Sequence, residues 1–145
     1  MTPVASGGCM CGAVRFELTA LRDTFGACHC EMCRRWTGSA LLGINVPDAD
    51  ITFTGTEHIQ RFQSSDWAER AWCSRCGTGL WYRVTAPGPL SGAYEIPIGL
   101  LDDANGLTMV REIFIDQKPD AFAYHGERTT LTRAEVLALY GVELD

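Results

Sequence analysis

The stretch ACHCEMCRRWTGSA, at residues 27–40, places three cysteines within six positions. The spacing C-x-C followed by C-x-x-C allows the thiolates of Cys28, Cys30 and Cys33 to converge from the end of a strand and the turn that follows it. Three protein ligands leave one position of a tetrahedral zinc ion free, and catalytic zinc sites are built in this way. We therefore predict an open metal site at these three cysteines.

His29 is the obvious candidate for a fourth ligand of this site. It lies between two cysteines whose thiols must point to the same side, and successive side chains of an extended strand point to opposite faces. We therefore expect His29 to be a buried, hydrogen-bonded neighbour of the site, and its coordination of the metal stays the alternative.

The other four cysteines form a second candidate site. Cys9 and Cys11 are separated by one residue, so their thiols share a side of an extended chain. Cys73 and Cys76 form a C-x-x-C turn followed by Gly77, which supplies the left-handed conformation that such a turn needs. Four thiolates around one zinc ion make a closed, structural site that contributes folding energy directly.

Disulfide, redox and iron chemistry are the alternatives for these thiols. The N-terminus MTPVASGGC lacks the basic start and the apolar core of a signal peptide, so we expect a reducing, cytoplasmic environment. Seven cysteines also leave one thiol over from a complete disulfide framework, whereas they divide into metal sites of four and three. Thioredoxin-type chemistry at Cys30 and Cys33 would leave Cys28 unexplained, and thiolates do not strongly exclude iron.

Polar residues directly follow the three-cysteine motif. Three thiolates give a bound Zn²⁺ a net charge of about −1, so nearby cations are expected, and Arg34 and Arg35 come next in the chain. One of these arginines could bind a substrate carboxylate, and the alternative is a surface ion pair. Thr37 and Ser39 could add hydroxyl donors to the same pocket, so all four are candidate binding residues.

Composition places the chain among globular proteins of one domain. It has 145 residues, of which 46% are hydrophobic and 21% charged, with a net charge of −6. An acidic balance argues against nucleic-acid binding as the main activity. No apolar run approaches the roughly 20 residues that span a bilayer, so we expect no membrane association.

The pattern of short β-branched and aromatic segments predicts a mainly β protein. Segments at strand length occupy residues 13–18, 41–46, 51–55, 58–63, 70–72, 79–84, 94–101 and 110–115. A short helical turn is expected after Cys30. A C-terminal helix is expected over 131–141, with Thr132 as its N-cap, Glu135 completing a capping box and Gly141 as its end.

Three segments, GGCMCGAVRFE, CHCEMCRRWTGSA and WCSRCGTGLWY, resemble in order and spacing the motifs of the glutathione-dependent formaldehyde-activating enzyme family, which includes centromere protein V-like proteins. The resemblance covers about residues 7–115. It implies a single β-tent-like zinc-binding domain over residues 1–145 with two zinc ions. By this resemblance the structural zinc is held by Cys9, Cys11, Cys73 and Cys76, and the catalytic zinc by Cys28, Cys30 and Cys33.

The resemblance also implies a reaction, the condensation of glutathione with formaldehyde to S-hydroxymethylglutathione by a carbon–sulfur lyase. Glutathione, or a related small thiol, and a small aldehyde are then the expected partners. Two alternatives use the same three-cysteine site: a non-catalytic zinc-binding module, and a redox or metal-handling protein.

Overall fold

The computed structural model describes residues 2–141. The chain divides into two compact units, which we describe separately. The first unit comprises Met1–Asp23 and Ile44–Leu107, and the second comprises Thr24–Gly43 and Thr108–Asp145. The expectation of one domain over residues 1–145 stays a prediction.

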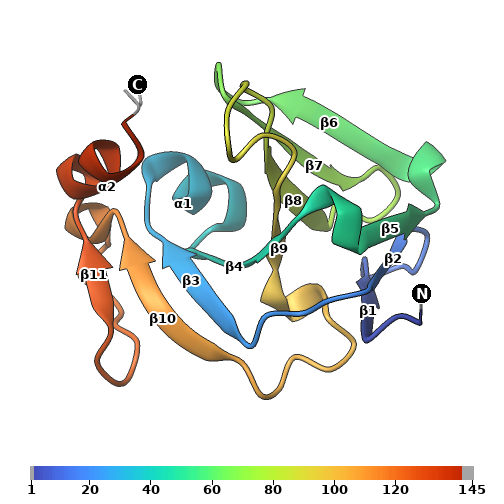
Figure 1. The fold of residues 1–145 in the computed structure, drawn as a ribbon, viewed down its shortest axis with the longest axis horizontal. Helices are drawn as coiled ribbons and strands as arrows, with labels where there is room; N and C mark the ends of the chain where they lie inside the picture. The colour runs from blue at the N-terminus through green and yellow to red at the C-terminus, as the bar shows by residue number, and fades with distance from the viewer. Residues whose placement is uncertain (1, 142–145) are drawn as a thin grey trace. The chain divides into compact units, whose positions relative to one another are not determined.

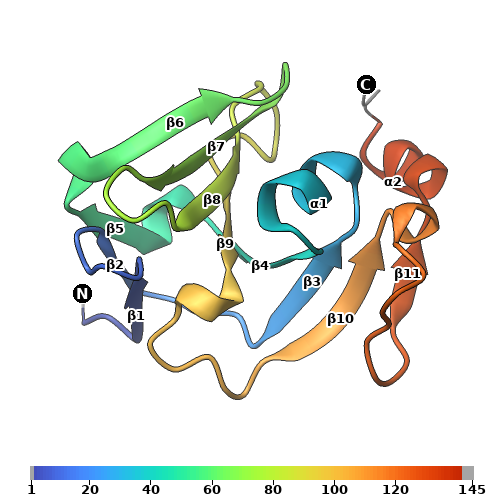
Figure 2. The same ribbon diagram turned by 180° about the vertical axis from the view of Figure 1, so that it is seen from behind.

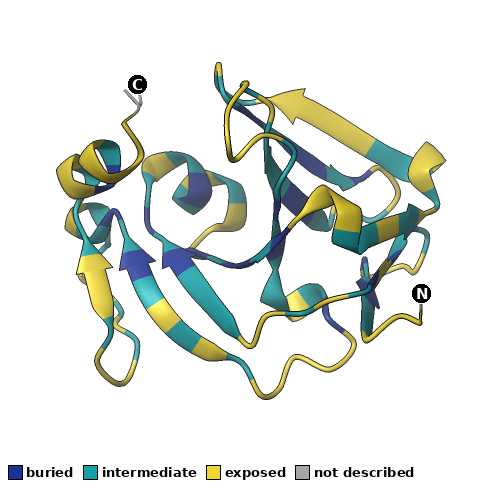
Figure 3. Cartoon of the chain, viewed as in Figure 1, coloured by how far each residue is buried: buried dark blue, intermediate teal, exposed yellow. Residues whose placement is uncertain are grey.

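The first unit contains two antiparallel β-structures (Figures 1 and 2). A three-stranded sheet has the order β1-β2-β5, formed by Ala5–Gly8, Arg15–Leu18 and Ile51–Thr54. Four further strands pair in the order β6-β7-β8-β9, formed by Ile59–Gln63, Ala68–Cys73, Gly79–Val84 and Tyr94–Pro97. Strand β6 is at one end of this order, so only one of its edges is paired among residues 2–141. Figure 3 shows that β6 is mostly exposed, whereas β7 is largely buried.

The second unit combines parallel strands with the two α-helices. Strand β10 (Thr108–Ile113) pairs in parallel with β3 (Thr24–Cys28) and with β11 (Thr129–Leu131). The helices are α1 (Glu31–Thr37), which follows β3, and α2 (Arg133–Tyr140), which follows β11. Strand β4 (Leu41–Val46) pairs antiparallel with β3 and then continues into the first unit.

An aromatic cluster forms much of the core of the first unit. The Trp81 ring lies 4.8 Å from Phe53 and 5.1 Å from Tyr94 between centroids, and Phe16 approaches Phe53 edge-on at 5.9 Å. Trp81 is 1% exposed, and its indole N–H donates to Glu69 at 2.9 Å. The edge-on and tilted ring contacts and this satisfied polar group allow a large side chain to be buried without an unpaired donor.

The mainly β class with a short C-terminal helix is confirmed. Helix α2 begins after the N-cap Thr132, both hydrogen bonds of the capping box to Glu135 are present, and Gly141 ends the helix with φ 63°. The helical turn after Cys30 is α1. Seven of the eight expected strands are present, with ends shifted by at most two residues.

The remaining strand is shorter than expected. Residues 94–101 form a strand only over Tyr94–Pro97, and a 3₁₀ helix follows at Ile98–Leu100. Pro97 lacks the N–H that would continue the ladder, which explains this end. Strands β1, β3 and β11 were not expected, because their glycine, threonine and cysteine content carries no apolar alternation.

Among the described residues, no helix is long and apolar enough to cross a membrane. The cytoplasmic location stays a prediction.

Gly55 holds a close approach between two backbone segments of the first unit. Its φ is 76°, and a Cβ added there would lie 1.8 Å from the carbonyl oxygen of Ala13. Gly106 has a similar φ of 80°, but a Cβ there would meet nothing within 4 Å. The two glycines therefore share the left-handed conformation and differ in the steric contact.

We expect Gly55→Ala to lower the free energy of unfolding by about 3 kcal/mol or more, because backbone must move to admit the methyl group. Gly106→Ala should lower the free energy of unfolding by only about 1 kcal/mol, because alanine is less stable than glycine in the left-handed conformation. Urea unfolding of both variants, loaded with metal, measures the difference. If both variants lost the same free energy of unfolding, the close approach of Gly55 to the Ala13 carbonyl would be contradicted.

Candidate metal centres

The four cysteines of the predicted closed site lie together in the first unit. The Sγ atoms of Cys9, Cys11, Cys73 and Cys76 all lie within 4.8 Å of one another. The Cys11 Sγ is 3.7 Å from that of Cys9 and 3.8 Å from that of Cys73. A zinc ion with Zn–S bonds of about 2.3 Å needs sulfur atoms about 3.8 Å apart. The sulfur positions therefore fit a tetrahedral zinc ion.

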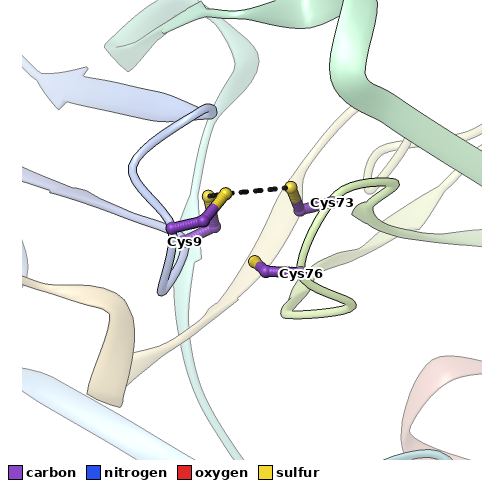
Figure 4. Close-up of side chains that lie close together, drawn as sticks. Cys9, Cys73 and Cys76 are labelled. Carbon is purple, nitrogen blue, oxygen red and sulfur yellow. Dashed lines mark hydrogen bonds between the residues drawn. The ribbon is translucent and has the colours of Figure 1, made fainter.

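Two turns bring these sulfurs together, and Figure 4 shows the labelled Cys9, Cys73 and Cys76 converging from them. One turn lies between β1 and β2, where the Cys9 Sγ accepts the N–H of Val14 at 3.3 Å. The other lies between β7 and β8, where Gly77 has φ 79° and donates to the Cys73 carbonyl at 2.8 Å. The left-handed glycine expected after the C-x-x-C motif is confirmed.

Thr78 connects the two turns, and the sequence did not single it out. Its hydroxyl oxygen accepts the Met10 N–H at 3.1 Å and lies 3.1 Å from the Cys76 Sγ. Since the oxygen already accepts from Met10, its own proton is available to the sulfur. This side-chain hydrogen bond, followed by one from the Thr78 backbone, lowers the pKa of Cys76 to about 5. Cys76 is therefore prepared to be a thiolate, the form that binds metal.

The three cysteines of the predicted open site lie together in the second unit, within 4.8 Å of one another at Sγ. Cys28 ends β3, Cys30 is the N-cap of α1, and Cys33 lies in that helix. The Cys30 Sγ accepts the Cys33 N–H at 3.3 Å, so the start of the helix fixes the Cys30 sulfur.

The three thiols oppose one another's ionisation. Hydrogen bonding with Cys30, and then with Cys33, raises the pKa of Cys28 well above its usual value. A divalent cation reverses this effect, because it stabilises thiolates directly. The donor set of three soft sulfurs fits zinc, with iron as the other metal of this chemistry.

His29 turns away from the thiols. Its Nε2 lies 2.8 Å from the Glu112 Oε1, and neither of its ring nitrogens belongs to the three-sulfur group. Its side chain is 0% exposed, and the rings of Phe122 and Tyr124 lie 5.9 and 6.1 Å from it between centroids. The expectation of a buried, hydrogen-bonded neighbour is confirmed.

Glu112 connects His29 to a second cation. Its Oε2 accepts from the Arg128 Nη1 at 2.9 Å, and both side chains are less than a tenth exposed. Burial alone would raise the pKa of Glu112, but the hydrogen bonds from His29 and Arg128 lower it. Neither Glu112 nor Arg128 lies in a motif, so no signal in the sequence points to either residue.

The four candidate binding residues lie on α1 and just after it. The Arg35 Nε pairs with Glu31 at 3.0 Å on an exposed face, which is the surface ion pair that we considered as the alternative. Arg34 has no ion-pair partner within residues 2–141. The Thr37 hydroxyl lies 2.8 Å from the carbonyl oxygens of Cys33 and Ser39, and the Ser39 hydroxyl donates to the Ala40 carbonyl at 3.2 Å. Their role in substrate binding stays a prediction.

The fold and the two sulfur groups define a class: a mainly β protein with one four-thiol and one three-thiol group. The family model of the glutathione-dependent formaldehyde-activating enzyme matches residues 4–117. The chain belongs to that family, as its cysteine motifs indicated.

Three individual proteins are similar to this chain. A Schizosaccharomyces pombe protein described as an "uncharacterized lyase" is 27% identical over 93% of this chain and 96% of its own length. A Halomonas elongata protein described as a "putative glutathione-dependent formaldehyde-activating enzyme" is 37% identical over 52% of this chain and 53% of its own length. The crystal structure of a Rhodobacter sphaeroides protein superposes with a TM-score of 0.57 at 25% identity, over 69% of this chain and 90% of that one.

Proposed function

We propose that this protein is a zinc-dependent carbon–sulfur lyase-type enzyme that joins glutathione, or a related small thiol, to formaldehyde or another small aldehyde. Membership of the family and the names of the relatives support a lyase. The observation that carries the proposal is the three-thiol group, to which no fourth histidine, cysteine or carboxylate ligand belongs among residues 2–141. An ion held there keeps one position for a substrate atom.

The residues of the chain would hold the metal and orient the two substrates, and none of them would form a covalent bond with a substrate. Cys28, Cys30 and Cys33 would bind zinc, which when present stabilises the substrate as a thiolate near neutral pH. Arg34, with no ion-pair partner within residues 2–141, offers a cation for a carboxylate of the thiol substrate. In the reaction the thiol sulfur bonds to the carbonyl carbon, and the thiol proton is transferred to the carbonyl oxygen, so the product is a hemithioacetal.

His29 and Glu112 would position the ligands. Their 2.8 Å hydrogen bond fixes the residue between Cys28 and Cys30 to strand β10, which limits the movement of both thiols. Holding two reactants in the correct geometry is expected to supply most of the acceleration for such an intrinsically easy addition.

Metal content and catalysis test the proposal together. We expect about two zinc ions per chain by mass spectrometry of the metals, one of them removed readily by a chelator because its site is open. Exchange NMR on formaldehyde with glutathione should show a faster addition at micromolar protein, and chelation should abolish the increase. A single, tightly held ion would contradict the open site.

The absence of any rate increase in the two-zinc protein would reject the named reaction. It would favour a non-catalytic zinc-binding module or a redox or metal-handling protein that uses the same three cysteines.

A further inference from the structure

The second unit contains a cavity of about 420 Å³ that no cysteine lines. Its walls come from β10, from β11 and from the segment between them, and include Glu112 and Arg128. Ligand cavities for small molecules range from about 300 to 1,000 Å³, so the volume of this one suits a small organic ligand. The cavity is outside the set of residues to which we have assigned metal or substrate binding.

Arg128 reaches this cavity with unused hydrogen-bond donors. Its side chain is only 8% exposed. One terminal nitrogen donates to Glu112 and the other to the His125 carbonyl, whereas the buried Nε–H has no acceptor. A guanidinium has five N–H groups, so several remain after these two bonds. The Nε atom is inaccessible to solvent, so a ligand in the cavity would accept from the remaining terminal N–H groups.

Glu112 does not supply the missing acceptor. One of its oxygens accepts from His29 and the other from the Arg128 Nη1. Both of its oxygens are therefore occupied. A second carboxylate, that of Glu127, also lines the cavity, so the formal charges of the wall balance and the remaining N–H donors of Arg128 still lack an acceptor.

Other cavity residues add donors of the same kind. The Lys118 ammonium donates to the carbonyl oxygens of Pro119 and Phe122, which leaves one of its three N–H groups. The hydroxyls of Tyr124 and Thr130 have no hydrogen-bond partner within residues 2–141. Burial raises the pKa of Tyr124, so its hydroxyl is a donor at neutral pH. The N–H and O–H donors that remain suit the oxygen atoms of an anion, beside the Glu127 carboxylate that also lines the cavity.

We propose that this cavity binds a small carboxylate, with Arg128 and Lys118 as its cationic contacts and Tyr124 and Thr130 as neutral donors. Planar guanidinium and carboxylate groups match in geometry, which favours a carboxylate. For a free organic acid the proposal goes beyond the proposed function, because binding here requires neither a bound metal nor a reaction; for the thiol substrate it rests on the proposed function. The carboxylate belongs either to a free organic acid or to the thiol substrate itself.

Titration of the ¹⁵N-labelled full-length, zinc-loaded protein tests this site. The probes are succinate, its neutral analogue succinamide, and S-methylglutathione, which carries carboxylates but no free thiol. The Nε–Hε resonance of Arg128, assigned by its loss in Arg128→Lys, reports a change at this side chain when a ligand binds its terminal nitrogens. We expect succinate or S-methylglutathione to shift it with saturation, and succinamide to bind at least about tenfold more weakly, since it lacks the charge.

Variants separate this cavity from the rest of the surface. We expect Lys118→Gln to weaken succinate binding about tenfold. Lys118 also donates hydrogen bonds to two carbonyls, so its substitution could change the local structure. The double variant Tyr124→Phe/Thr130→Val is therefore a second test, because it removes only the two unpartnered hydroxyls. We expect this variant to bind succinate about threefold more weakly. The control Arg22→Gln removes an exposed arginine of the first unit and should change the affinity by less than about twofold.

Saturation by succinate identifies a free organic acid as the source, and saturation by S-methylglutathione alone identifies the thiol substrate. If neither carboxylate moves the Arg128 resonance at 50 mM, or if succinamide moves it equally, the cavity is not a carboxylate site. These shifts are measured without turnover, so loss of the proposed reaction would leave this result intact.

Discussion

Cys76→Ser is expected to leave the protein without its native fold. Four cysteine sulfurs from two distant turns lie close together, with separations that fit a zinc ion. Structural zinc contributes about 10–16 kcal/mol to folding in small zinc proteins, and domains have a net stability of only about 5–15 kcal/mol. Loss of one thiolate from a closed site therefore removes a contribution as large as the whole stability.

Far-ultraviolet circular dichroism, the dispersion of amide resonances and the zinc content measure this effect. Ser74→Ala is the matched control, because Ser74 is exposed in the same turn and its side chain is outside the thiol group. We expect the control to retain its fold and its full zinc content. A Cys76→Ser protein with the native thermal midpoint would refute a structural role for the closed site.

Cys30→Ser is expected to abolish activity while the fold persists. The Cys30 Sγ caps α1 by accepting the N–H of Cys33 at 3.3 Å. Serine is among the preferred N-cap residues, so the substituted hydroxyl takes over that hydrogen bond. A hydroxyl is a poor ligand for zinc compared with a thiolate, so the open site loses its metal. We expect at least about a hundredfold loss in the rate of the proposed addition.

Comparison with Cys30→Ala separates the two roles of the Cys30 side chain, as the N-cap of α1 and as a metal ligand. Alanine removes both, so it should lose activity to the same extent and also lower the free energy of unfolding by about 1 kcal/mol relative to serine. Exchange NMR gives the rates, and urea unfolding gives the stabilities. If Cys30→Ser unfolded the chain as Cys76→Ser is expected to do, the division into structural and catalytic cysteines would be wrong.

Local spacing explains why the two thiol groups could be predicted. The C-x-C and C-x-x-C motifs set the distance between neighbouring sulfurs through one turn of backbone, and Gly77 adopts the left-handed conformation that its position requires. The C-terminal helix could be predicted from local signals too, because Thr132, Glu135 and Gly141 define both of its ends. Such features depend on a few consecutive residues, so the sequence contains all the necessary information.

Strands without an apolar pattern could not be predicted in the same way. Strand β3 contains a single large apolar residue, Phe25, among threonine, glycine, alanine and cysteine, and it forms because it pairs with β4 on one side and β10 on the other. Its hydrogen bonds depend on partners far along the chain, which no local propensity reports.

The sequence by itself determined which cysteines group together and that one group has three members. It also predicted that His29 faces away from the thiols, since alternation along a strand is a local property. Only the tertiary structure decided what His29 faces: Glu112, 83 positions later, which in turn holds Arg128 beside a cavity. The Thr78 hydroxyl accepts the N–H of Met10, 68 positions earlier, for the same reason. Packing and burial decide which groups meet at such separations. The local sequence around a charged or hydroxyl side chain does not indicate which distant group will be its hydrogen-bond partner.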